Sequence, residues 1–487
     1  MKPRFALGML AVSLLGLVSA PAFSASTAAS APTALVAFQG YEVRLKAARG
    51  AVEAAEQGGR AGALKLASAL NELGSVHVLN ADFDLAEPVF ERALSLRESR
   101  LGPDHPDVAT SLNNLGLVYL GQGRLDKAEG LLNRAFDIRE GVRGYTSIEV
   151  ANSLNNLGAY HKARGNYAKS ALLHKRALDL RERALSPTHP DVAMSLGNLA
   201  ELYRAQGLFP AAEPLQARAL AIREKALAAD HPDVAASLGD QCELLREQGR
   251  YAQAEKLCLR AMGIRERTLG AGHPDVALSL LATAELYRSQ YRFSAAEPLY
   301  RRALEIREQR LGRTHPEVAS ALTRLAALYA DQRQYALAER TLQRAVIIRE
   351  ERLGRDHPDY AEVLARQAAV VSAQGRHEEA DVLLDEAFLA LQDGVWSDHP
   401  ALVLAESVRA RVALAEGNVA RAEPLYRRAL AMREKNLPAA HPAVARARYE
   451  LAELYRLQGR YLEATPRFKK SLASLEQVFG PEHPELL

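Results

Sequence analysis

The chain has 487 residues, of which 48% are hydrophobic, so it has ample apolar material for a folded core. Its 62 lysines and arginines nearly balance its 59 aspartates and glutamates, and the formal net charge is +3 at pH 7. This balance gives no electrostatic reason to expect nucleic acid or an anionic membrane surface as the main partner.

Residues 1–24 have the pattern of a secretory signal peptide. Lys2 and Arg4 form a short basic start, an apolar stretch of 14 residues follows, and Ala22-Phe23-Ser24 offers a cleavage site. The alternative is an uncleaved membrane anchor, but the stretch is shorter than the roughly 20 residues that cross a bilayer. We therefore expect an exported protein, periplasmic first and secreted as the alternative, with no membrane insertion after cleavage.

Residues 25–62 precede the regular part of the chain. Within them Val43, Ala47, Ala51 and Ala55 recur at helical spacing, with charged residues between them. We expect a helix here that covers the start of the array that follows, because the ends of such arrays are usually capped.

The dipeptide His-Pro divides the chain into units of constant length. It occurs at His105 and, after one gap of 84 residues, every 42 residues as far as His483. The missing copy falls at residues 147–148, inside a unit that otherwise keeps the pattern, so nine units span 105–482 without an insertion or deletion. Residues 63–104 keep the pattern without His-Pro and make a tenth unit. Such repetition predicts a solenoid of stacked, equivalent elements.

The unit that begins at His189 shows two helices joined by a turn. Pro190 and Asp191 suit a first helical turn, since proline there sacrifices no hydrogen bond and an acidic residue favours the positive end of the helix dipole. Apolar residues continue at helical spacing to Tyr203, and Gly207 then ends the helix because glycine adopts a left-handed backbone at low cost. A second stretch of helical periodicity follows.

Three positions of the unit hold small residues in nearly every copy. Small residues at a helix crossing let the two axes approach closely, whereas larger ones would push them apart. We therefore expect stacked antiparallel helix pairs. The column in the first helix reads Gly74, Gly116, Gly158, Ala200, Cys242, Ala284, Ala326, Ala368, Ala410 and Ala452.

These features resemble the tetratricopeptide repeat. The resemblance rests on Gly or Ala followed three residues later by Tyr, as at Tyr119 and Tyr203, and on two alanine columns in the second helix. The 42-residue length and the stretch 296–308 are similar to the kinesin light chain subclass, here in an exported bacterial form. The resemblance covers residues 63–482 and implies an all-α, right-handed superhelical solenoid of ten antiparallel hairpins, with 483–487 as a short tail.

No pattern typical of an enzyme is present in the sequence. It has no glycine-rich phosphate loop, no Gly-x-Ser-x-Gly and no paired Cys-x-x-Cys. Nine of the 13 histidines belong to His-Pro and are separated by a whole hairpin, so we expect helix-start residues and not metal ligands. We expect no catalytic residue, no metal and no cofactor.

The dipeptide Arg-Glu recurs near the end of the second helix of the unit. We interpret it as a solvated helix end whose ion pairs bridge adjacent units, in preference to a charged binding strip. The arginines are Arg97, Arg139, Arg181, Arg223, Arg265, Arg307, Arg349 and Arg433.

Cys242 and Cys258 are the only cysteines. In the register of the tetratricopeptide repeat, Cys242 takes the small position of the first helix and Cys258 the bulky position of the second. Both positions face the space inside one hairpin. An oxidising periplasm would permit a disulfide there. The alternative is two buried thiols that behave as small apolar residues.

The same resemblance implies a peptide-binding groove, because the first helix of each tetratricopeptide hairpin lines the concave face. Asparagine offers a donor and an acceptor to a peptide backbone, and arginine binds carboxylates. Kinesin light chains similarly hold cargo peptides in an asparagine-rich groove. The alternative is that these are ordinary solvated helix residues. The groove positions are Asn71, Asn113, Asn114, Asn155, Asn156, Asn198, Arg204, Arg246 and Arg288.

From the sequence we expect a non-enzymatic scaffold or adaptor that binds extended segments of a protein partner. The alternative is a structural assembly factor of a cell-envelope complex that uses the outer faces or the ends of the solenoid. A carbohydrate ligand is disfavoured, since only 6% of the residues are aromatic and Trp396 is the single tryptophan.

Overall fold

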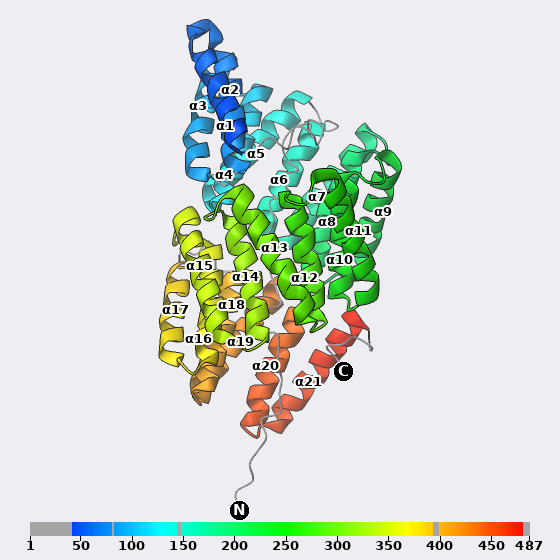
Figure 1. Cartoon of the computed structure of the whole chain (residues 1–487), viewed down its shortest axis with the longest axis vertical. Coiled ribbons are helices and arrows are strands. Elements are labelled where there is room, and N and C mark those ends of the chain that lie inside the picture. The colour runs from blue at the N-terminus through cyan, green and yellow to red at the C-terminus, as the bar shows by residue number, and fades with distance from the viewer. Residues whose placement is uncertain (1–40, 80–81, 144–147, 393–398, 481–487) are drawn as a thin grey trace, which may run out of the picture.

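A computed structural model describes residues 41–79, 82–143, 148–392 and 399–480. All regular structure in these ranges is helical, with 21 α-helices and one short 3₁₀ helix (Figure 1). The predicted all-α solenoid of helix hairpins is confirmed. The expected signal peptide at 1–24 and the expected tail at 483–487 lie outside the described residues.

Helix α1 (Tyr41–Glu56) and the 3₁₀ helix η3 (Gly59–Gly62) precede ten consecutive hairpins, each made of a helix A and a helix B. The A helices are α2 (Ala63–Leu79), α4 (Pro106–Gly121), α6 (Ile148–Ala163), α8 (Pro190–Ala205), α10 (Pro232–Glu247), α12 (Pro274–Ser289), α14 (Pro316–Asp331), α16 (Pro358–Ala373), α18 (Pro400–Ala415) and α20 (Pro442–Leu457). The B helices are α3 (Phe83–Leu101), α5 (Leu125–Arg143), α7 (Tyr167–Ala184), α9 (Phe209–Ala226), α11 (Tyr251–Leu269), α13 (Phe293–Leu311), α15 (Tyr335–Leu353), α17 (His377–Leu389), α19 (Val419–Asn436) and α21 (Tyr461–Phe479). Helix α1 packs on the first hairpin through Leu45, Ala48 and Val52.

The histidine of His-Pro begins helix A, as predicted. In α8, for example, His189 is the N-cap, and its Nδ1 accepts a hydrogen bond from the backbone N–H of Asp191 at 3.2 Å. An N-cap acceptor satisfies one of the backbone donors that the first helical turn leaves unpaired. The same bond occurs at His105, His231, His273, His315, His357, His399 and His441.

The turn between helices A and B requires a left-handed backbone. Gly207 supplies it in the fourth unit with φ +65°, whereas Tyr291 and Arg333 take the equivalent position in two later units with φ 58° and 60°. The small column explains how closely the two helices then pack. A Cβ built on Gly74 would lie 2.7 Å from the ring of Phe90 on the facing helix, so a side chain there would force the hairpin open.

The Arg–Glu series is not a solvated helix end, and that part of the sequence interpretation is wrong. Arg181 is 1% exposed and donates to Ser195 Oγ at 2.5 Å, in helix A of the next unit. Equivalent bonds join Arg97 to Ser111, Arg139 to Ser153, Arg223 to Ser237 and Arg265 to Ser279. The arginines do bridge adjacent units, as predicted, but they do so from inside the wall, where burial lowers the pKa of Arg181.

Units six places apart in the array also touch, so successive superhelical turns are in contact. We call these contacts the seam. Arg352 pairs with Asp82, and the Nε2 of His441 lies 3.2 Å from the carbonyl oxygen of Ala205. The rings of Phe209 and Phe479 stack with centroids 6.1 Å apart. Figure 1 shows the same arrangement, with α21 reaching back toward the helices near α9.

Candidate functional site

Helices A line the inner side of the solenoid. Successive A helices contact one another from α2 through α12, whereas successive B helices do not approach as closely in the described part of the chain. Helices that converge on one side lie on the concave face of a curved array. The predicted groove residues all lie on these A helices.

Two pairs of asparagines form hydrogen bonds between neighbouring A helices, and we call each pair a rung. Asn114 Nδ2 donates to Asn71 Oδ1 at 3.2 Å, and Asn156 Nδ2 donates to Asn113 Oδ1 at 2.7 Å. In each pair the partners are 43 residues apart, which is one unit plus one residue. Asn71, Asn113 and Asn156 are more than nine-tenths buried, so their amides bind the wall of the solenoid.

The next pair of asparagines along the array does not form a rung. Asn155 and Asn198 stand at the equivalent positions, but Asn155 Oδ1 lies 3.0 Å from Nδ1 of His174. Burial lowers the pKa of His174 to about 4, so this imidazole is neutral near pH 7. The row of asparagines predicted for the groove therefore ends at this unit, and Asn198 is half-buried without a rung.

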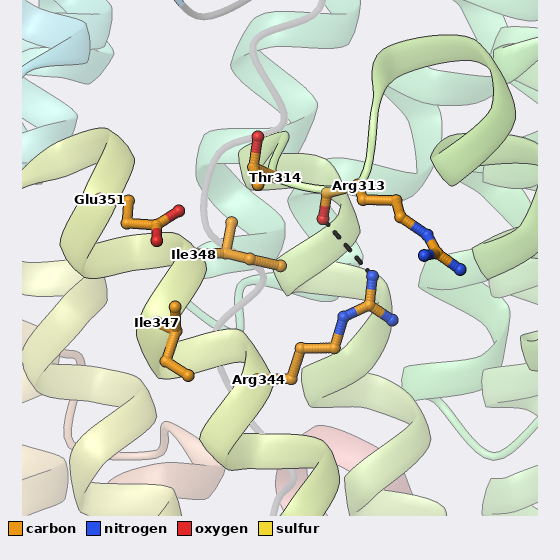
Figure 2. Close-up of a pocket in the computed structure, with 6 residues that line it drawn as sticks. All are labelled: Arg313, Thr314, Arg344, Ile347, Ile348 and Glu351. Atoms are coloured by element: carbon orange, nitrogen blue, oxygen red, sulfur yellow. Dashed lines mark hydrogen bonds between the residues drawn. The ribbon is translucent and has the colours of Figure 1, made fainter.

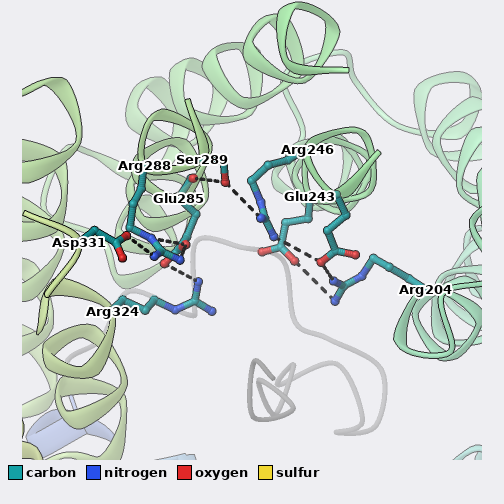
Figure 3. Close-up of polar contacts among 9 residues, drawn as sticks. Arg204, Glu243, Arg246, Glu285, Arg288, Ser289, Arg324 and Asp331 are labelled. Atoms are coloured by element: carbon teal, nitrogen blue, oxygen red, sulfur yellow. Dashed lines mark hydrogen bonds and ion pairs between the residues drawn. The ribbon is translucent and has the colours of Figure 1, made fainter. Parts of the chain in front are cut away.

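A chain of ion pairs continues along the inner face from α8 to α14 (Figure 3). Arg204 pairs with Glu247 at 2.6 Å and with Glu243 at 3.5 Å. Arg288 pairs with Asp331 at 2.7 Å and with Glu285 at 3.0 Å. The predicted arginines are thus placed together on one face, but each already has acidic partners in its own or the next unit.

Further pairs extend and connect this chain. Lys162 pairs with Glu201 at 2.5 Å, Arg246 with Glu247 at 3.3 Å, and Arg324 with Glu285 at 3.6 Å. We call the whole set, from Lys162 to Asp331, the inner ladder. Since its cations and carboxylates neutralise one another, a charged partner must exchange with existing pairs.

The electrostatic consequences differ along the ladder. Burial opposes ionisation of Glu285, but Arg288 and Arg324 outweigh it and lower the pKa of Glu285 to about 2. The side chain of Asp240 is exposed to water, but many protein atoms lie around it on the inner face. The resulting partial desolvation raises the pKa of Asp240 to about 6. Arg223 and Arg204 lower the pKa of Asp240, but they do not outweigh the effect of burial as the cations beside Glu285 do.

Sequence reasoning missed Glu247, Asp331 and Asp240 as parts of this face. The signal that identifies the first two is the same offset of 43 residues that joins the asparagine rungs, from Arg204 to Glu247 and from Arg288 to Asp331. Side chains with that offset meet because successive A helices are shifted by one residue relative to each other on the inner face.

Cys242 and Cys258 form a disulfide inside the fifth hairpin, with Cα atoms 5.5 Å apart. The two residues are on α10 and α11 and are at most 1% exposed. The bond links the small position of helix A directly to the bulky position of helix B.

The outer surface carries a hollow of about 420 Å³ between α15 and the loop before α14 (Figure 2). Arg344 donates to the carbonyl oxygen of Arg313 across it at 3.5 Å. The equivalent arginine makes the same contact in other units, as Arg218 does with Pro187 and Arg302 with Ala271. The hollow is therefore a product of the repeat geometry and not a built site.

The described residues contain no cluster of three or more side chains suited to a metal ion. No described helix combines the length and the apolar character that a membrane span needs.

The sequence matches the tetratricopeptide repeat family over residues 65–141, 149–225, 195–241, 233–309, 317–392 and 402–477. The chain belongs to the tetratricopeptide repeat family. The matches cover most of the chain, and they fall on the hairpins that the structure shows. No curated protein matches the sequence at a significant level.

Solved structures similar to this tetratricopeptide repeat protein include the Rap protein complexed with Competence and Sporulation Factor. That likeness has a TM-score of 0.54 at 12% identity and covers 85% of this chain and 98% of that chain, so it concerns the fold alone. The kinesin light chain TPR-like repeats of Podosopora anserina match with a TM-score of 0.37 at 24% identity, covering 42% of this chain and 97% of that one. BtubC (BKLC) from P. vanneervenii matches with a TM-score of 0.36 at 21% identity, covering 56% and 92%.

Proposed function

We propose that this protein is a non-catalytic scaffold that binds extended segments of other proteins along its inner face. The observation that carries the proposal is the inner ladder, a row of cations and carboxylates placed on consecutive A helices. An extended chain of alternating donors, acceptors and charges matches such a row better than a compact small molecule does.

In this proposal the residues of the groove that contact the partner are Arg204, Arg246, Arg288, Asn155 and Asn198. The buried asparagines of the two rungs shape the wall on which these residues stand. A partner with acidic side chains gains bidentate contacts from the arginines, while the carboxylates of the ladder discriminate against a segment of unbroken negative charge.

The setting of this function is the cell envelope. The proposal rests on the pattern of residues 1–24, with its basic start, apolar stretch and small residues before the cleavage site. We expect the mature protein in a periplasmic fraction, beginning at or near residue 25. A full-length, membrane-bound form would instead support an uncleaved anchor.

Site-specific photocrosslinking tests the inner-face proposal without disturbing the ladder. A photoreactive residue is placed at Asp240, which faces the inner space, or at Val382, which is 66% exposed on helix B of the eighth hairpin. We expect a partner from an envelope extract to crosslink from position 240 and not from position 382. Equal crosslinking from both positions would contradict binding along the inner face.

A second candidate is an assembly factor that binds through the last hairpin. The exposed apolar residues Leu457, Tyr461 and Leu462 favour it, since Leu462 is 94% exposed. Placing the same photoreactive residue at Leu462 distinguishes the two functions. A partner that binds the end of the solenoid would crosslink at position 462 and not at position 240.

A further inference from the structure

Two of the histidines that begin A helices also form hydrogen bonds across the seam. The Nδ1 of His441 accepts its cap bond from the backbone N–H of Ala443 at 2.9 Å, and its Nε2 lies 3.2 Å from the carbonyl oxygen of Ala205. Since Nδ1 is an acceptor, the neutral ring carries its proton on Nε2 and donates it to Ala205. One ring therefore caps its own helix and also binds the preceding superhelical turn.

His357 repeats this arrangement two units earlier. Its Nδ1 accepts a hydrogen bond from the backbone N–H of Asp359 at 3.1 Å, and the ring has a backbone hydrogen bond with Gly121. Gly121 precedes His357 by 236 residues, the same separation that joins Ala205 to His441. Gly121 and Ala205 are also the last residues of their A helices, α4 and α8. The two contacts are thus equivalent, and we call His357 and His441 the seam histidines.

The seam leaves these rings little room to turn. His357 is 9% exposed and His441 is 6% exposed, whereas His189 and His231, which cap helices without a described bond across the seam, are only partly buried. A Cβ built on Gly207 would lie 2.9 Å from Cδ2 of His441, so the two turns are in close contact there. A seam histidine therefore keeps both of its bonds while the seam is closed.

The surroundings of His441 oppose a second proton on its ring. Burial is the largest cause, and the charges of Arg433 and Arg446 add to it, so the pKa of His441 falls to about 4 although the bond to Ala205 acts in the other direction. Protonation would also place a hydrogen on Nδ1 opposite the N–H of Ala443, and two donors would then face each other. A protonated His441 therefore does not fit the closed seam.

The surroundings of His357 act in the same direction. Burial lowers the pKa of His357 and the charge of Arg349 adds to this effect, whereas Asp359 and the bond with Gly121 oppose it. His399 in the next unit also faces His357 and Asp359, and burial lowers the pKa of His399 to about 4. The charge of His357 lowers that pKa further, so these two rings repel each other when both are protonated.

We propose that the seam histidines make the superhelix sensitive to acid, so that their protonation separates successive superhelical turns while the hairpins stay folded. In the open form each ring is solvated and takes up a proton near pH 6.5, whereas in the closed form His441 resists protonation down to about pH 4. The histidines therefore stabilise the closed form fully above pH 6.5, and this stabilisation is lost toward pH 4. Over that range His441 alone shifts the equilibrium toward the open form by roughly 100-fold.

Small-angle X-ray scattering of the purified protein between pH 7 and pH 4 tests the proposal. We expect the radius of gyration of the wild type to rise as the pH falls from 6.5 to 4, with unchanged helical content in circular dichroism. The variant His357→Asn with His441→Asn keeps an acceptor at each cap but takes up no proton, so its radius should change by less than about a third as much. A variant already expanded at pH 7 would likewise show that these two rings hold the seam closed.

The matched control comes from caps that do not bond across the seam. The variant His189→Asn with His231→Asn removes the same number of titrating caps, and both positions are partly exposed. We expect its radius of gyration to follow the wild-type profile at every pH. If this control also loses the acid response, the response comes from capping in general and the inference fails.

Three further results would overturn the inference. A wild-type radius that stays constant to pH 4 would show that protonation does not open the seam. Loss of helical content together with the expansion would mean that acid unfolds the hairpins. A variant of the seam histidines that keeps the wild-type profile would place the acid response elsewhere. Asp82→Asn, which removes the carboxylate that pairs with Arg352 across the seam, would then test whether that ion pair carries it.

Discussion

Arg181 shows how a single side chain links two units of the array. It is 1% exposed and donates to Ser195 Oγ and to Asn152 Oδ1, both at 2.5 Å. A buried cation with polar partners on neighbouring helices is held in place by its surroundings, and removing it leaves those partners unsatisfied.

We expect Arg181→Ala to lower the free energy of unfolding by about 3 kcal/mol, because it creates a cavity and strands two polar groups. Urea denaturation followed by circular dichroism measures the change. Arg183→Ala on the same helix is the control. The side chain of Arg183 is 70% exposed and pairs with the exposed Asp179, so its removal should change stability by less than about 0.5 kcal/mol. Equal effects of both substitutions would contradict the buried role of Arg181.

The histidine caps make stability depend on pH. Burial lowers the pKa of His315, His399 and His441 to about 4, and each ring must be neutral for Nδ1 to accept its cap bond. The unfolded chain takes up these protons near pH 6.5, whereas the folded caps resist protonation down to about pH 4. Their contribution is therefore complete above pH 6.5 and is lost as the pH falls toward 4.

We expect His441→Asn to reduce this loss by about 2 kcal/mol between pH 7 and pH 4, because asparagine caps a helix without titrating. Urea midpoints at four pH values between these limits measure the slope. A slope identical to that of the wild type would show that His441 does not contribute to acid unfolding.

The roles of some single residues could be predicted from the sequence, and those of others could not. The His-Pro register located the start of eight A helices, because capping and proline placement are local effects that the sequence carries. The burial of the Arg–Glu arginines could not be read in the same way. Five of them donate to a serine in the next unit, and an Arg–Glu pair at a helix end has the same sequence whether it faces water or a neighbouring helix.

At the scale of the hairpin, the fifth unit differs from the rest through Cys242 and Cys258. A bond across 16 residues restricts the unfolded chain and, in the entropy model, contributes about 3 kcal/mol. In the seventh unit the equivalent positions hold Ala326 and Leu342, which fill the same space without a bond.

We expect the unreduced, denatured protein to show no reactive thiol. Reduction with dithiothreitol should lower the stability by about 2–3 kcal/mol. The variant Cys242→Ala with Cys258→Leu copies the seventh unit, so its stability should be insensitive to the reductant. Two thiols that react without reduction would show that the cysteines are free.

The inner face illustrates what a hairpin pattern can and cannot predict. The register assigned Arg204, Arg246 and Arg288 to one face, and they do lie together on it. For Arg204 and Arg288, neutralisation depends on acidic partners at an offset of one unit plus one residue, and this offset follows from how successive units stack. The burial of the asparagine rungs has the same origin, because the bonds from Asn114 to Asn71 and from Asn156 to Asn113 use the same offset.

For the molecule as a whole, the seam adds contacts that a simple array of repeats does not have. In most repeat proteins each unit touches only its neighbours, and stability is a sum of local terms. Here Asp82 meets Arg352, and Phe209 meets Phe479, across more than half the chain. No sequence period predicts this, since it depends on the pitch of the superhelix.

We expect Asp82→Arg combined with Phe479→Asp to open the seam and to increase the radius of gyration measured by small-angle X-ray scattering. The first change opposes Arg352 with a like charge, and the second places a carboxylate against an aromatic ring. Helical content should stay the same in circular dichroism, because the hairpins themselves are intact. An unchanged scattering curve would mean that the turns hold together without these contacts.

The seam also constrains how such a chain can change in length. Tandem arrays commonly gain or lose whole units by recombination between similar stretches of gene, and a loss at any internal place preserves every nearest-neighbour packing surface. In this chain the loss of one unit between the fourth and the tenth would bring the fourth unit opposite a position beyond the last described hairpin, so that Phe209 would have no Phe479 to meet. The contact between Phe209 and Phe479 therefore depends on the number of units between them as well as on the sequence of each unit.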